Sequence, residues 1–105
     1  MKVYISGKIS GLPPVQVKEK FKQAVKQVAA YQYVPVSPLD NGCKDDDPWE
    51  VQMQACIGQL LGCEAIYLLR DWKDSVGARI EAYIAQERGL LIMEQPDYAD
   101  YKPNN

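Results

Sequence analysis

Four short apolar runs along the chain predict β-strands. They cover residues 2–6, 33–36, 65–69 and 90–93. The third run, AIYLL, is apolar without alternation, which is typical of a parallel strand that is covered on both faces. The second run contains Pro35, and because proline cannot donate to a ladder on both sides, we expect this strand at an edge of the sheet.

The stretches between these runs have helical periodicity. In 15–30 the apolar residues recur at offsets of four, seven, eight and eleven, and Pro14 opens this helix. A second amphipathic pattern covers 49–61 and ends at Gly62. Asp47 precedes it as the expected N-cap, followed by Pro at the first helical position and Glu at the third.

The third helix is expected to begin with a hydroxyl cap. Ser75 is a favourable N-cap residue, the pattern runs to about Arg88, and Gly89 ends it. The resulting order is βαβαβαβ, which predicts parallel strands with right-handed crossovers. With the proline-bearing strand at an edge, we expect a Rossmann-like three-layer α/β fold. Its four-stranded parallel sheet has the order 2-1-3-4, with helices on both faces.

This order places a topological switch point between the first and third strands, where open α/β sheets bind ligands beyond the carboxyl ends. The two loops that face this crevice are 6–11 and 70–75. We expect residues 1–93 to form a single domain and 94–105 to form a polar and aromatic tail. The tail carries two tyrosines, Tyr98 and Tyr101, which we expect to cover the pocket of a neighbouring copy.

The composition narrows the possible chemistry. The 105 residues include 12 Lys+Arg, 14 Asp+Glu and no His, for a formal charge of −2. Without His, both Ser-His and Cys-His catalysis and every His-ligated metal are excluded. The slightly negative charge argues against a dedicated binder of nucleic-acid polymers. No apolar run approaches the roughly 20 residues that a membrane span needs.

The three cysteines leave at least one unpaired, and no secretory signal is recognisable at the start of the chain. We therefore expect a cytoplasmic protein. Cys56 and Cys63 are seven residues apart, which suits neither a redox pair nor a zinc knuckle, and we interpret both as small core residues. We expect no metal site and no cofactor.

The first crevice loop combines glycines, hydroxyls and a lysine. Ser6, Gly7, Lys8 and Gly11 follow the first strand directly, and exposed amides in such a loop bind oxyanions. The loop lacks the spacing of a Walker motif, so a phosphate or sugar site is one interpretation and a turn needed only for geometry is the other.

The second crevice loop leads into the third helix. Ser75 as a cap and Gly77 in the first turn make this helix start a ready anion site. Glu81 shares a face with Gly77 and other small or apolar residues, which places a carboxylate on the stripe that faces the sheet. Such a carboxylate needs a buried partner or a ligand, because burying an unpaired charge is costly.

Other polar and aromatic features have simpler explanations. In the acidic run 45–47, Asp47 is interpreted as the helix cap and the other two aspartates as solvated, with metal binding as the less favoured alternative. Trp49 is expected in the core, whereas Trp72 remains a candidate for stacking on a base.

Three groups of residues together resemble a known family. They are Tyr4-Ile5-Ser6-Gly7-x-x-x-Gly11, Pro48-Trp49, and Trp72-x-x-Ser75-x-Gly77-Ala78-x-x-Glu81-x-x-x-Ala85. In this order and over residues 2–93 they resemble the nucleoside 2-deoxyribosyltransferase-like superfamily, and more closely its short branch from bacteria and bacteriophages. The resemblance implies a homodimer or larger homo-oligomer that acts on a small-molecule nucleoside or nucleotide.

The implied activity is cleavage or exchange of the N-glycosidic bond of deoxynucleosides or their 5′-monophosphates. The family's nucleophilic glutamate corresponds to Glu81, and its phosphate- or sugar-binding serine corresponds to Ser75. Tyr4 would lie near the sugar, and the loop from Ser6 to Gly11 would line the nucleotide site.

The second catalytic group departs from the family pattern. The position of the family's catalytic aspartate falls near Cys56, and a thiol substitutes poorly for a carboxylic acid. Asp71 or Asp74, at the rim of the crevice, are the alternatives for the acid or base. The sequence thus leaves a second hypothesis open, in which the protein binds or sequesters a nucleotide-derived metabolite without cleaving it.

Overall fold

Four parallel strands form the centre of the fold in a computed structural model that describes residues 1–96. The strands are β1 (Lys2–Ser6), β2 (Val34–Val36), β3 (Ala65–Leu68) and β4 (Leu91–Glu94). Their order is β2-β1-β3-β4, and all three pairings are parallel, which confirms the order predicted from the sequence. The edge position of the proline-bearing strand is confirmed as well.

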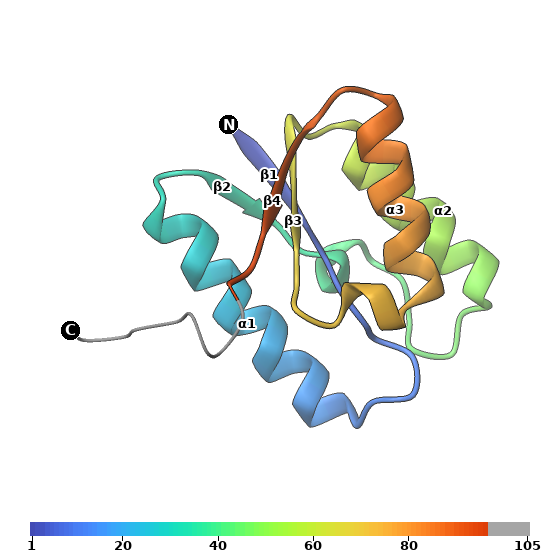
Figure 1. Cartoon of the computed structure of the whole chain (residues 1–105). Coiled ribbons are helices and arrows are strands. Elements are labelled where there is room, and N and C mark those ends of the chain that lie inside the picture. The colour runs from blue at the N-terminus through green and yellow to red at the C-terminus, as the bar shows by residue number, and fades with distance from the viewer. Residues whose placement is uncertain (97–105) are drawn as a thin grey trace.

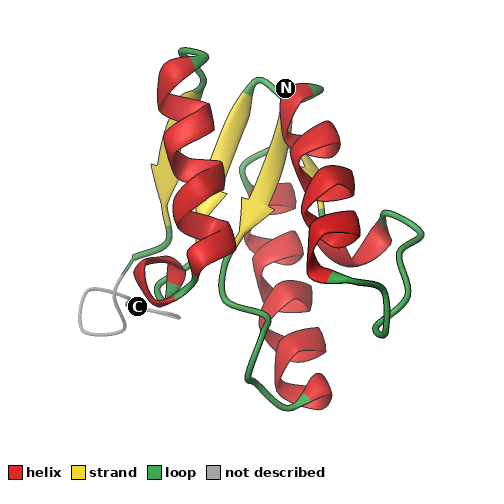
Figure 2. Cartoon of the chain, turned by 90° about the vertical axis from the view of Figure 1, so that its right-hand side faces the viewer, coloured by secondary structure: helices red, strands yellow, loops and turns green. Residues whose placement is uncertain are grey.

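Three α-helices cover the sheet (Figure 1). They are α1 (Pro14–Ala30), α2 (Trp49–Leu61) and α3 (Val76–Glu87). Figure 2 shows α2 and α3 together on one face and α1 on the other, as expected for a three-layer fold. Two short 3₁₀ turns, η1 (Pro38–Asp40) and η2 (Trp72–Asp74), lie in the connections after β2 and β3.

The alternation of side chains along β1 divides the core into two clusters. Val3 and Ile5 pack toward α1 together with Phe21. Tyr4 points to the other face, where it packs with Leu60 of α2 and other residues of α2 and α3. The even-numbered positions of β1 therefore face the layer that contains Glu81, and this parity decides which residues of the strand can reach it.

Helix starts follow the sequence prediction in one case and depart from it in another. The Ser75 hydroxyl oxygen accepts a hydrogen bond from the Ala78 N–H at 3.1 Å, so the predicted N-cap of α3 is confirmed. The prediction of Asp47 as N-cap of α2 is wrong, because Pro48 occupies that position without a side-chain cap. Asp47 instead accepts from the Lys44 N–H at 2.8 Å and closes the preceding turn.

The structure also tests the positions predicted for Trp49 and for the cysteines. Trp49 is 46% exposed, so its predicted core position is wrong; it is the first residue of α2 and lines an open cavity. Cys56 and Cys63 are buried, which confirms them as core residues.

The proposed role of Tyr98 and Tyr101 concerns residues outside the described range 1–96. No helix within that range is long and apolar enough to cross a membrane.

Gly7 is required where β1 leaves the sheet. A Cβ atom at this position would lie 2.7 to 2.9 Å from three side-chain atoms of Leu69, which is itself buried. The Leu69 N–H donates to the Ser6 carbonyl at 2.8 Å, and this bond holds the two segments at close approach. Any side chain at Gly7 must therefore displace a packed leucine.

We expect Gly7→Ala to destabilise the fold by about 1–3 kcal/mol, because overpacking displaces Leu69. Gly58→Ala is the matched control: a Cβ there meets nothing within 4 Å, and removal of a glycine from the interior of α2 should stabilise by about 0.5–1 kcal/mol. Urea denaturation at 25 °C measures both changes. Equal effects of the two substitutions would contradict the close approach.

Candidate functional site

A cavity of about 380 Å³ opens at the carboxyl end of β1, where the sequence places the topological switch point. Its walls come from the loop after β1, one side of α2, and the segment from η2 into α3. The lining residues are Gly7, Lys8, Ile9, Ser10, Trp49, Gln52, Met53, Cys56, Asp74, Ser75, Val76, Gly77, Ala78 and Glu81. The two loops expected to face the crevice thus both contribute.

Glu81 is the buried charged residue of this cavity. It lies in the second turn of α3 on the face toward the sheet and is only 5% exposed. The Tyr4 hydroxyl donates to Oε2 at 2.9 Å, and the Ser6 hydroxyl donates to Oε1 at 2.6 Å. The buried partners that such a carboxylate requires are therefore supplied by β1.

Burial and hydrogen bonding act on Glu81 in opposite directions. Burial raises the pKa of Glu81 above its ordinary value, and the hydrogen bonds from Ser6 and Tyr4 oppose part of this rise. Burial, with the charge of Glu81 as a smaller cause, strongly raises the pKa of Tyr4, so its hydroxyl stays protonated and remains a donor. Burial also raises the pKa of Cys56, which therefore lines the cavity as a neutral thiol.

Part of the cavity wall has features that suit an anion. Lys8 lines the cavity and brings a positive charge, and the first turn of α3 borders it through Ser75 and Gly77. A Cβ at Gly77 would lie 3.0 Å from the Met53 sulfur, so α2 and α3 approach each other closely here. The positive end of the α3 dipole and the Lys8 charge together favour a negatively charged group on this side.

Five residues predicted for the site do not line the cavity, namely Tyr4, Ser6, Gly11, Asp71 and Trp72. Tyr4 and Ser6 lie behind Glu81 and bond to it. Gly11 adopts a positive φ of 85° in the loop before α1, which is a geometric reason for glycine. Trp72 is half-buried against the core cluster around Tyr4, with Lys73 Nζ 5.8 Å from the centre of its ring.

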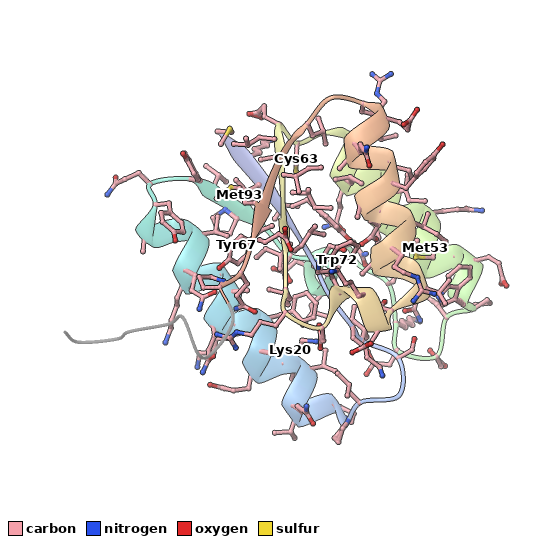
Figure 3. The ribbon with its side chains drawn as sticks, viewed as in Figure 1. Lys20, Met53, Cys63, Tyr67, Trp72 and Met93 are labelled. Atoms are coloured by element: carbon pink, nitrogen blue, oxygen red, sulfur yellow. The ribbon has the colours of Figure 1, made fainter. Side chains whose placement is uncertain are left out.

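Asp71 holds the first crevice loop in place. It forms an ion pair with Lys20 of α1 and accepts from the Lys8 N–H at 3.1 Å. Lys20 also donates to the Lys8 carbonyl at 2.6 Å, so three segments meet at this carboxylate. Figure 3 shows Lys20 where α1 passes the turn after β3. Of the two aspartates considered as acid or base, Asp74 lines the cavity and Asp71 is engaged in this clamp.

Sequence reasoning identified Cys56 but missed two further residues of α2 at the site, Gln52 and Met53. Gln52 and Met53 line the cavity, and Gln52 is four residues before Cys56, which puts both on one side of the helix. The sequence signal that could have indicated this is a polar glutamine on the same side of the helix as a core cysteine. A second cavity of about 360 Å³ adjoins the first and shares Ile9, Ser10, Gln52 and Cys56 with it.

No group of three or more His, Cys, Asp or Glu side chains in residues 1–96 is arranged to hold a metal ion. The chemistry that the cavity offers is that of a buried carboxylate, a neutral thiol and a lysine, with Asp74 at the rim. A carboxylate so placed can act as a nucleophile toward an electrophilic carbon of a bound ligand.

Comparisons with known proteins agree with this architecture. A family profile described as a domain of unknown function (DUF4406) matches residues 1–94. A solved structure described as "2-desoxiribosyltransferase from Leishmania mexicana" matches with a TM-score of 0.68 and 18% sequence identity. The match covers 89% of this chain but 62% of that chain, and at this identity it shows a shared fold. No curated protein matches the sequence.

We expect Asp71→Ala to destabilise the protein by about 1–2 kcal/mol, because it removes the ion pair with Lys20 and the acceptor of the Lys8 N–H. Amide hydrogen exchange at residues 7–11 should accelerate, since the loop loses its anchor to the turn after β3. Asp46→Ala, at an exposed position, is the control. An unchanged exchange rate in Asp71→Ala would show that Asp71 does not hold this loop in place.

The raised pKa of Glu81 makes folding stability depend on pH. The folded state favours the protonated carboxyl, so this contribution is fully present below the unfolded-state value near 4.5 and is lost as pH rises through the folded-state pKa. Glu81→Gln removes the ionisation. We expect this variant to be more stable than the wild type at pH 7 by on the order of 1 kcal/mol, with the difference vanishing toward pH 4.

Urea denaturation between pH 4 and 8 measures this difference. Glu87→Gln changes an exposed glutamate of the same helix and should follow the wild-type curve. A Glu81→Gln curve parallel to that of the wild type would show that burial does not shift the pKa of Glu81.

Proposed function

The chain belongs to the DUF4406 family, and we propose that it cleaves or exchanges the N-glycosidic bond of a deoxynucleoside or its 5′-monophosphate. The observation that carries this proposal is Glu81 itself. It is a buried carboxylate at a cavity wall, and its partners in the described structure are two neutral hydroxyls. The fold shared with the deoxyribosyltransferase structure supports the same reaction class.

In the proposed reaction a Glu81 oxygen attacks the anomeric carbon of the sugar. The carbon–nitrogen bond breaks, its electron pair leaves with the base, and the base takes up a proton. The product is a glycosyl ester of Glu81. Water then attacks the anomeric carbon and gives the free sugar, or a second base attacks and gives a new nucleoside, and Glu81 is released as a carboxylate.

The remaining residues of the cavity suit the parts of such a substrate. Lys8, Ser75 and Gly77 surround the side that favours an anion, and we assign them to a 5′-phosphate or the sugar hydroxyls. Asp74 is the carboxyl group available at the rim, and in its protonated form it would donate the proton to the leaving base and become a carboxylate. Trp49, exposed at the start of α2, offers a ring on which a base can stack.

One observation favours a second function, which is binding without cleavage. Cys56 lies between the two cavities as a neutral thiol, where a carboxylic acid would be a stronger proton donor. Asp74, the other candidate for the acid, lies at the cavity rim and is exposed to solvent. In this alternative the cavity sequesters a nucleotide-derived metabolite intact.

A panel of deoxynucleosides and their 5′-monophosphates, analysed for free base by liquid chromatography and mass spectrometry, separates these functions. We expect free base from the wild type, with loss of turnover on the order of 10³-fold or more in Glu81→Ala. Glu87→Ala is the matched control on the exposed face of α3 and should retain full activity. A glycosyl adduct on the peptide that contains Glu81 would identify the nucleophile directly.

A ligand that raises the melting temperature and is recovered intact would instead establish binding without cleavage. The absence of both free base and any thermal shift across the panel would contradict both functions.

A further inference from the structure

Ser6 occupies a different place from the one that its loop suggests. The sequence groups it with the glycines and lysine that follow β1, as a candidate contact for a nucleotide. In the structure it is the last residue of β1, is 1% exposed and does not line the cavity. Its hydroxyl donates its hydrogen to Glu81 Oε1 at 2.6 Å, so this hydrogen is not available to a ligand, and burial keeps the oxygen away from the cavity.

Tyr4 and Ser6 act on Glu81 as a pair because of the strand period. Residues two apart on a strand point to the same face, so both hydroxyls lie on the side of α3. Each donates to a different oxygen of the carboxylate, which fixes the orientation of its plane. β1 is hydrogen-bonded to β2 on one side and β3 on the other, so the strand that carries both donors is itself held rigidly.

The charge of Glu81 is offset by these hydroxyls alone among the described contacts. The ion pair in residues 1–96 joins Lys20 and Asp71, and Glu81 takes part in none there. A nearby cation would stabilise the ionised carboxylate more strongly but would also weaken it as a nucleophile. Two neutral donors keep a buried carboxylate oriented and partly stabilised, with a smaller loss of nucleophilicity than a cation would cause.

We propose that Ser6 is a positioning residue for Glu81, which holds one carboxylate oxygen in place and favours the ionised form that attacks the sugar. This inference rests on the proposed function for the attack, whereas the effect on the ionisation of Glu81 holds without any substrate. Ser6 acts through Glu81 and does not touch the ligand.

The test measures the ionisation of Glu81 by NMR titration of side-chain carboxyl carbons in protein labelled at glutamate. The spectrum of Glu81→Gln identifies the resonance of Glu81. We expect Ser6→Ala to raise the pKa of Glu81 by about one pH unit relative to the wild type, because a hydrogen bond to the charged form is lost. Ser6→Cys retains a weaker donor and should give an intermediate value.

Ser37→Ala is the matched control. Ser37 is also a buried serine with one bonded hydroxyl, which accepts from the Leu39 N–H at 3.2 Å, and it lines neither cavity. This variant should leave the pKa of Glu81 unchanged. A pKa in Ser6→Ala equal to that of the wild type, or an equal shift in Ser37→Ala, would overturn the proposal. If Ser6→Ala does not fold, Ser6→Cys decides, and a wild-type pKa there has the same meaning.

A second readout applies once free base is detected. Because the ionised carboxylate is the reactive form, the acidic limb of the pH–rate profile should shift to higher pH in Ser6→Ala. The size of this shift should equal the change in the pKa of Glu81 measured by titration. Activity without such a movement would show that Ser6 does not govern the reactive form. A shifted titration in a protein that forms no free base would instead support the positioning role and refute the proposed reaction.

Discussion

The cost of burying one carboxylate organises the functional half of this protein. Glu81 enters the layer between α3 and β1, where an unpaired charge would destabilise the fold by several kcal/mol. Tyr4 and Ser6 meet that cost only because β1 presents both hydroxyls toward α3. A change of register by one residue would turn them to the face of α1 and leave the carboxylate unpaired. The register of β1 therefore determines whether Glu81 has its two hydrogen-bond donors.

The loops around the cavity are held by contacts that lie outside it. Gly7 passes closely over Leu69, and Asp71 joins the first crevice loop to both α1 and the turn after β3. These contacts keep Lys8 and the start of α3 in the wall of one cavity. Residues that look chemically active in the sequence thus divide into two groups, those that face the cavity and those that build its frame. Asp71 belongs to the second group.

Local patterns predicted much of this architecture from the sequence. Pro35 indicated an edge strand, Ser75 a helix cap, and the spacing of small residues around Glu81 a position facing the sheet. Each depends on neighbours within one or two turns. The partners of Glu81 were not predictable in this way, because Tyr4 and Ser6 are 77 and 75 residues away and meet it through tertiary packing.

The errors have the same origin. Trp49 has the apolar side chain of a core residue, but it begins α2 at the wall of an open cavity and remains about half exposed. Asp47 has a good capping side chain, but it accepts from the Lys44 N–H of the preceding turn, and Pro48 takes the N-cap position of α2. In both cases the residue type indicated a plausible role. The local sequence did not show which other groups surround the side chain in the folded structure.

The two edges of the sheet differ in what they offer to another chain. The Val34 N–H donates inward to the Met1 carbonyl, and amides alternate in direction along a strand, so the position of Pro35 that lacks an N–H faces outward. The proline therefore removes no hydrogen bond between β2 and β1, and it leaves one fewer N–H donor on the outer edge of the sheet. β4 retains its amides and exposes Leu91 and Ile92. Templated addition of a foreign strand is therefore disfavoured at β2, and any aggregation by strand pairing would start from β4.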